Sequence, residues 1–212
     1  MSLAAPTLAA LRRTVQVVDG LAGMDRSWRE FVRDTRPGVD LGRPEHRASL
    51  LRWLNRWGCR IRLPRPGEPA VFDHGVEAWW ERRGAALPTA SLPMLDDAAI
   101  AVLCAAYVDL VAVPVTAGAR VRTMGPTAAA KTLYAIRPDT VMLWDEAIAI
   151  RLHGSRDGAA FAAHLRLGRA WAAAVAAEAG VAADALPALL GRPVSLAKIL
   201  DEYCYVTITR GR

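Results

Sequence analysis

Lysine is nearly absent from this sequence of 212 residues. Lys131 and Lys198 are the only lysines among 27 basic residues, so the other 25 are arginines. With 21 acidic residues the formal net charge is +6, which would normally favour a nucleic-acid partner. An arginine- and alanine-rich composition is also typical of GC-rich genomes. The charge therefore indicates a partner only if it gathers on one face of the molecule.

Cysteine and histidine are also scarce, and their spacing excludes the common metal motifs. The three cysteines, Cys59, Cys104 and Cys204, are odd in number and far apart, with no CxxC pair. A zinc knuckle, an iron–sulfur loop and a disulfide framework are therefore disfavoured. No two of the four histidines stand four residues apart. We expect no metal and no cofactor, and we expect Cys104 to be a core thiol.

Long hydrophobic runs and nucleotide motifs are missing as well. The most apolar stretch, residues 98–113, is interrupted by Asp109 and is too short to span a bilayer. The N-terminus has no basic segment before its apolar part, unlike a signal peptide. No GxSxG, Walker loop, Rossmann fingerprint or HExxH occurs. We expect a soluble, cytoplasmic protein.

The apolar residues that are present have helical spacing, and they predict an all-α, multi-helix globular domain. Residues 3–34 read as two helices divided at Gly20 and Gly23, and a later helix is expected to end at Gly58. Ser91 is the expected cap of a long buried helix. A glycine-containing turn is expected at 117–118, and Ser195 is expected to cap a last helix. Only the tail, YCYVTITRGR, has β character, so at most a short extended tail is predicted.

The chain is predicted to form one compact domain with two parts. Residues 1–90 are expected to be N-terminal helices packing on the core, with a Pro/Gly-rich loop at 63–75. Residues 91–212 are expected to form a C-terminal helical core.

One stretch of that core, GPTAAAKTLYAIRPDTVMLWDEAIAIRLHG, holds the candidate site. Pro126 suits the first turn of a helix, and free N–H groups at such a helix start can hold a phosphate. Thr127, Lys131 and Tyr134 lie three or four residues apart and should share one face. Arg137 precedes a proline and should end the helix.

Asp145 follows the apolar segment VMLW and stands where the cap of the next helix should be. This order of parts resembles the helix–hairpin–helix (HhH-GPD) DNA glycosylases over residues 121–150. Gly125 matches the last glycine of their hairpin, Asp145 matches their catalytic aspartate, and Thr127 falls at the slot that bifunctional members fill with lysine. The hairpin itself reads VRTMG and lacks the first glycine. The sequence is also similar to uncharacterised bacterial all-helical proteins.

The resemblance implies a monofunctional base-excision enzyme that binds double-stranded DNA. Asp145 would stabilise a sugar cation as the base leaves, and Lys131 is the second candidate catalytic residue. The residues expected to bind phosphate are Gly125, Pro126, Thr127, Arg122 and Arg137, and those expected to line a pocket are Tyr134, Trp144 and His153.

Two other interpretations stay open. Asp145 and Lys131 could be structural, as a helix cap and an ion-pair partner, in a non-enzymatic module that contacts another protein. Alternatively, the start of the helix at Gly125–Pro126, with Lys131 and Arg137, could bind a small anionic ligand. A groove with Asp145 at its floor and arginines at its rim would favour DNA, a narrow closed pocket would favour the small ligand, and no cavity would favour the module.

Overall fold

Short polar side chains determine where several of the helices begin. At each of these positions a side-chain oxygen accepts a hydrogen bond from the backbone N–H three residues further on, which satisfies a donor that the helix itself leaves unpaired. The capping residues are Thr7, Asp96, Asp145, Asp157 and Ser195. The caps at Asp145 and Ser195 confirm two of the predictions from sequence.

The computed structural model describes residues 3–20, 24–116 and 121–211, and within these ranges the fold is all-α. The helices are α1 (Leu8–Asp19), α2 (Met24–Asp34), α3 (Pro44–Arg56), α4 (Val71–Arg83), α5 (Asp97–Val111), α6 (Gly125–Ile136), α7 (Glu146–His153), α8 (Gly158–Ala179), α9 (Leu186–Leu189) and α10 (Leu196–Cys204). Short 3₁₀ turns lie at Gly84–Ala86, Leu92–Met94 and Ala183–Ala185.

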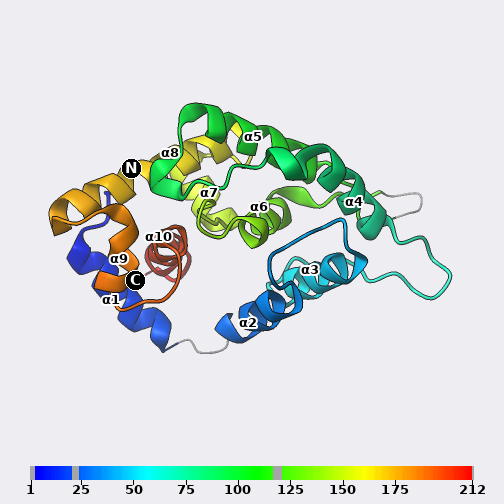
Figure 1. Ribbon diagram of the computed structural model, residues 1–212, viewed down its shortest axis with the longest axis horizontal. Coiled ribbons are helices and arrows are strands. Elements are labelled where there is room, and N and C mark those ends of the chain that lie inside the picture. The colour runs from blue at the N-terminus through cyan, green and yellow to red at the C-terminus, as the bar shows by residue number, and fades with distance from the viewer. Residues whose placement is uncertain (1–2, 21–23, 117–120, 212) are drawn as a thin grey trace.

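Helix α6 lies in the middle of the molecule (Figure 1). It packs against α5 on one side and against α3 on the other. Helices α1, α9 and α10 form one end, where both chain termini also lie, and α4 lies towards the opposite end (Figure 1). The three consecutive alanines Ala128, Ala129 and Ala130 are all buried, so neighbouring helices can approach α6 closely.

Aromatic side chains join the N-terminal helices to this centre. The ring of Trp28 in α2 lies 5.5 Å from that of Trp53 in α3 and 5.0 Å from that of Tyr134 in α6. Phe31 stacks on Trp53 at 5.4 Å. Offset and tilted pairs at such distances add stability beyond the burial of their surface. The N-terminal helices therefore pack directly on the central helix.

Four local predictions need correction. The loop expected at 63–75 ends at Ala70, because Phe72 and Val76 are buried on the inner face of α4. Ser91 does not cap the long helix, which begins after Asp96. The tail is not extended: Tyr205–Thr209 continues α10 as a π-helical turn that buries Val206. Cys104 is only half-buried, and its thiol donates to the carbonyl of Gly158 at 3.0 Å.

The division of the first helical region into α1 and α2 is confirmed, with Gly20 directly after α1. Gly23 and the turn expected at 117–118 lie outside the described residues. No single described helix is long and apolar enough to span a bilayer. The one pair that passes this test together, Gly158–Ala179 with Ala183–Leu189, is bent by 83°.

Candidate functional site

The stretch from Gly125 to Asp145 folds as its sequence suggests. Gly125 has a φ of +74°, a conformation that residues with side chains rarely adopt, and Pro126 follows in the first turn of α6. The helix ends before Arg137 and its following proline. Residues 141–144 are then fully buried without regular secondary structure and lead to Asp145, which caps α7.

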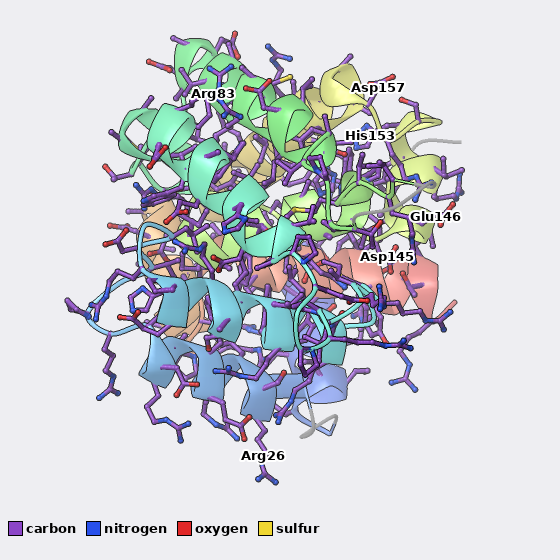
Figure 2. The ribbon with its side chains drawn as sticks, turned by 90° about the vertical axis from the view of Figure 1, so that its right-hand side faces the viewer. Arg26, Arg83, Asp145, Glu146, His153 and Asp157 are labelled. Atoms are coloured by element: carbon purple, nitrogen blue, oxygen red, sulfur yellow. The ribbon has the colours of Figure 1, made fainter. Side chains whose placement is uncertain are left out.

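Asp145 is a half-buried helix cap with both carboxylate oxygens engaged. Oδ1 accepts the backbone N–H of Ile148 at 2.8 Å, and Oδ2 accepts the hydroxyl of Thr209 at 2.8 Å. Figure 2 shows Asp145 beside the C-terminal helix, with Glu146 and His153 farther along the same edge. The two hydrogen bonds fix the position of the carboxylate at the start of α7.

Lys131 does not form the ion pair that its position suggested. Its ammonium group donates to the backbone carbonyl of Trp57 at 2.6 Å and lies 5.4 Å from the centre of that residue's ring. Within the described residues no carboxylate, including Asp145 and Asp139, comes within ion-pair distance of it. Lys131 therefore fastens α6 to the C-terminal end of α3, where a cation is favoured by the helix dipole.

A partly open cavity of about 590 Å³ lies between these two side chains. Its walls come from α1, α2, the end of α3, α6, the start of α7, and α10. The lining residues are Val18, Ser27, Arg56, Trp57, Gly58, Lys131, Leu143, Trp144, Asp145, Ile148, Lys198, Asp201, Glu202 and Tyr205. Both lysines of the chain therefore face one cavity, although they are 67 residues apart in the sequence.

The α10 wall of the cavity carries a neutralised charge network. Lys198 binds Asp201 at 2.6 Å, and Arg192 binds both oxygens of Glu202 at 2.6 and 2.9 Å. Arg192 also binds Asp19 of α1 at 2.8 Å. Burial lowers the pKa of Lys198, but the nearby carboxylates outweigh burial and leave its pKa raised. Lys198 therefore stays protonated and paired.

The expected phosphate-binding residues do not line this cavity. Gly125, Pro126 and Thr127 are half-buried at the start of α6, and Arg122 is exposed in the short segment that pairs with Val115. Arg137 donates to the carbonyls of Pro88 at 3.1 Å and Ile136 at 3.1 Å. Burial lowers the pKa of Arg137. Arg137 therefore binds carbonyls within the protein and does not line the cavity with Lys131.

The three residues that were expected to line a pocket do not lie in one place. Trp144 lines the cavity, and its buried indole N–H has no acceptor within the described chain. Tyr134 is buried against Trp28 instead. His153 lies on another side of Trp144, with its Nε2 3.1 Å from Nδ1 of His164.

Because Nε2 of His164 donates to the carbonyl of Leu143 at 2.9 Å, its Nδ1 is the acceptor from His153 when both rings are neutral. Burial lowers the pKa of His164 to about 3. Burial also lowers the pKa of His153. This histidine pair links α7 to α8 and was not apparent from sequence spacing.

The positive charge is concentrated in one segment of the chain, and most of its arginines are exposed. Residues 26–65 contain eleven arginines and four carboxylates, a net charge of +7, whereas the remaining 172 residues carry 16 basic and 17 acidic groups. Ten of these eleven arginines are exposed, and Arg47 alone is buried. We call the exposed set the arginine surface: Arg26, Arg29, Arg33, Arg36, Arg43, Arg52, Arg56, Arg60, Arg62 and Arg65.

Helical spacing places part of the arginine surface in one row. Arg26, Arg29 and Arg33 lie on the outer face of α2, whose inner face packs on Trp53 through Phe31. Figure 2 shows Arg26 projecting away from the body of the molecule at its lower edge. Arg56 belongs both to this surface and to the wall of the cavity. The arginine surface and the cavity therefore meet at the end of α3.

The carboxylates within this region do not neutralise it. Glu30 binds both Arg26 and Arg56, and its pKa is lowered, mainly by the hydrogen bond from Arg26. A second carboxylate, Asp34, binds Arg33 at 2.9 Å and Arg52 at 3.5 Å. Four members of the surface, Arg29, Arg36, Arg60 and Arg65, form no ion pair within the described ranges.

Sequence reasoning missed Trp57, Arg56 and Lys198 as parts of the site. Two signals could have found them: the chain has only two lysines, and its positive charge concentrates in one segment of forty residues.

Within the described ranges no group of three or more His, Cys, Asp or Glu side chains is arranged to hold a metal ion. Comparisons with protein-family models, with curated proteins and with solved structures give no match to this chain. The chemistry of the site therefore has to be argued from its residues alone.

Proposed function

We propose that this protein binds DNA through the arginine surface on α2, α3 and the loops that follow each of them. The observation that carries this proposal is the net charge of +7 within residues 26–65 in a chain that is otherwise near neutrality. Most contacts between proteins and DNA go to phosphate oxygens, and arginine binds these oxygens with two parallel N–H groups. A surface with ten exposed arginines suits that task.

The adjoining cavity supports an extension of this proposal to base excision. Asp145 lines a cavity whose rim includes Arg56, so a nucleotide displaced from a bound duplex could enter there. A carboxylate held by a helix N–H and a hydroxyl is fixed in position and can stabilise a developing sugar cation. Lys131 and Arg56 would then face the phosphates on either side of that nucleotide.

The first test is binding to a fluorescent DNA duplex across a salt series. Log affinity should fall linearly with log salt concentration, because each phosphate that the protein binds releases counterions. We expect the triple variant Arg29→Ala, Arg36→Ala, Arg60→Ala to bind more weakly. Its salt slope should be smaller by up to about 3, or about 1 for each phosphate that is no longer bound.

The matched control removes three other exposed arginines, Arg12, Arg82 and Arg210, and therefore changes the net charge equally. Its affinity should stay close to that of the wild type. Equal losses in both triple variants would mean that only total charge matters, and the arginine surface would not be the binding site. Tighter binding to an RNA hairpin than to the duplex would indicate that the partner is RNA and not DNA.

Base excision is tested with Asp145→Asn on duplexes that each contain one damaged base. The amide can still cap α7, so the variant should bind DNA about as well as the wild type. Release of the damaged base should be lost. Base release that continues in the variant would remove Asp145 from the chemistry and leave the DNA-binding proposal untouched.

A further inference from the structure

The cavity between α3, α6, α7 and α10 has charges of both signs, and most of them are already paired within the protein. Lys198 is paired with Asp201, and Glu202 is paired with Arg192. Arg56 is paired with Glu30. The pairs of Lys198 and Glu202 are buried and hold the α10 wall in place, whereas Arg56 is exposed and also belongs to the arginine surface. The cavity charges left over are the ammonium of Lys131 and the carboxylate of Asp145.

Lys131 retains two N–H donors for a ligand. An ammonium group has three donors, and one of them is used by the carbonyl of Trp57 at 2.6 Å. The ring of Trp57 also lies 5.5 Å from the ammonium of Lys198. Cation–π attraction to one indole ring therefore fixes both lysines of the chain on the same part of the cavity wall. An oxyanion bound there would meet a positively charged, preorganised donor.

Asp145 retains acceptor capacity on the α7 side. A carboxylate offers about four lone-pair positions, and Ile148 and Thr209 use two of them. Asp145 and Lys131 are not within ion-pair distance, so the two charges do not neutralise each other. The cavity presents a cation on one wall and an anion on another.

We propose that this cavity binds a small organic molecule that has two different ends: an oxyanion, which Lys131 binds, and an amino group, which Asp145 binds. The volume of about 590 Å³ falls within the range of about 300–1,000 Å³ that is usual for small-molecule sites. Phosphate and carboxylate are the two sources of the oxyanion. This site adjoins the arginine surface at Arg56, but its two ligand-binding groups, Lys131 and Asp145, are not part of that surface, and the proposal does not depend on DNA binding.

The chain's composition provides a direct measurement. Selective isotope labelling of lysine gives signals from two residues only, and both line the cavity. Three probes are titrated up to about 10 mM, which nearly saturates a site with a Kd of about 1 mM. AMP combines a phosphate with an amino group, glutamate combines carboxylates with an ammonium group, and inorganic phosphate is an oxyanion alone.

We expect saturable shifts of the Lys131 signals with AMP or glutamate, and at least tenfold weaker binding of inorganic phosphate. Saturation by AMP alone identifies a phosphate ligand, and saturation by glutamate alone identifies a carboxylate ligand. If none of the three probes shifts the lysine signals, the proposal is wrong. Phosphate binding as tightly as the two-ended probes would also overturn it, because the second end would then contribute nothing.

Variants test each end of the ligand separately. Asp145→Asn should weaken the preferred two-ended probe about tenfold without changing phosphate binding. Asp157→Asn is the matched control, because Asp157 caps α8 in the same way and lies outside the cavity. Equal weakening by both variants would contradict the role of Asp145.

Lys131→Met should abolish binding of all three probes, as followed by the Lys198 signals or by tryptophan fluorescence. If Lys131→Met unfolds the chain, the wild-type titration and Asp145→Asn still decide the question. The arginine triple variant should bind the probe as the wild type does. Loss of DNA binding and loss of ligand binding in the cavity can therefore be measured independently.

Discussion

Charge is organised differently on the two sides of the cavity. On α2 and α3, exposed arginines outnumber the carboxylates among them, and each of Glu30 and Asp34 is bound by two arginines. Along α10, the charged side chains are buried and matched: Lys198 by Asp201, and Glu202 by Arg192, which also binds Asp19 of α1. Both sides line the same cavity.

This difference follows from the cost of removing charge from water. An unpaired charge in the interior costs several kcal/mol, so the buried side can hold cations only where it also holds carboxylates. Exposed arginines remain hydrated, and an excess of them is tolerated. Excess positive charge on the surface is therefore free to serve a partner, whereas the buried charges serve the fold.

The largest expected effect comes from breaking the buried network. Arg192→Met leaves the carboxylate of Glu202, which is 2% exposed, without its main partner. We expect the free energy of unfolding to fall by about 3–5 kcal/mol, measured by urea denaturation. The double variant Arg192→Met, Glu202→Met should be more stable than the sum of the single changes predicts.

The contrast between the two sides is tested by Arg26→Ala on the exposed side. Its ion pair with Glu30 is in water, so we expect no measurable change in stability. If Arg26→Ala destabilised the protein as much as Arg192→Met, the distinction between exposed charge that the fold does not need and buried charge that stabilises it would not hold.

The next effect is the pH dependence of the histidine pair. The unfolded state takes up a proton on His164 below about pH 6.5, while the folded state resists until about pH 3. The unfolded state therefore binds more protons in this window, and stability falls as the pH falls. The expected contribution is about 1.4 kcal/mol per pH unit.

This contribution is measured by comparing how the stability of the wild type and of histidine variants changes with pH. His164→Gln should be less stable than the wild type at pH 7, but its stability should decline less steeply between pH 6 and pH 4. The exposed His74 provides the control, since His74→Gln should keep the wild-type slope. Equal slopes for His164→Gln and the wild type would show that His164 does not control this decline.

A smaller effect is expected at the cap of α7. Asp145→Ala removes the acceptor for the N–H of Ile148 and should lower the free energy of unfolding by about 0.5–2 kcal/mol. Asp145→Asn should lose less, because the amide oxygen can accept the same hydrogen bond. Thermal unfolding of the two variants separates the structural role of Asp145 from any role in binding. Identical losses of stability in the two variants would show that the charge of Asp145 stabilises the fold more than its capping hydrogen bond does.

The smallest effect is expected on the arginine surface itself. The triple variant Arg29→Ala, Arg36→Ala, Arg60→Ala should unfold within about 0.5 kcal/mol of the wild type, because these side chains form no ion pair within the described residues. Urea denaturation checks this. A large loss of stability would mean that these arginines support the fold and are not reserved for a partner.

The sequence predicted the local features of the fold well. The caps at Asp145 and Ser195 and the helix that begins at Gly125–Pro126 all appear as expected. Such features depend on backbone chemistry within a few residues. The errors in the loop before α4 and in the tail arose where burial of Phe72 or Val206 decided the conformation.

The candidate site was predictable only in part, for the same reason. Lys131, Trp144 and Asp145 come from one continuous stretch and do line one cavity. Arg137 belongs to that stretch too, but the packing of its neighbours directs it to backbone carbonyls.

By itself, the sequence determined where some helices begin, such as those capped by Asp145 and Ser195, that the fold is all-α and how much charge each segment carries. These properties depend on neighbouring residues and on composition. Only the tertiary structure decided that Trp57, Lys131 and Lys198 meet, and that Arg56 of α3 lines the cavity of Asp145. Contacts between residues far apart in the chain depend on how the helices pack, and packing is set by the whole core.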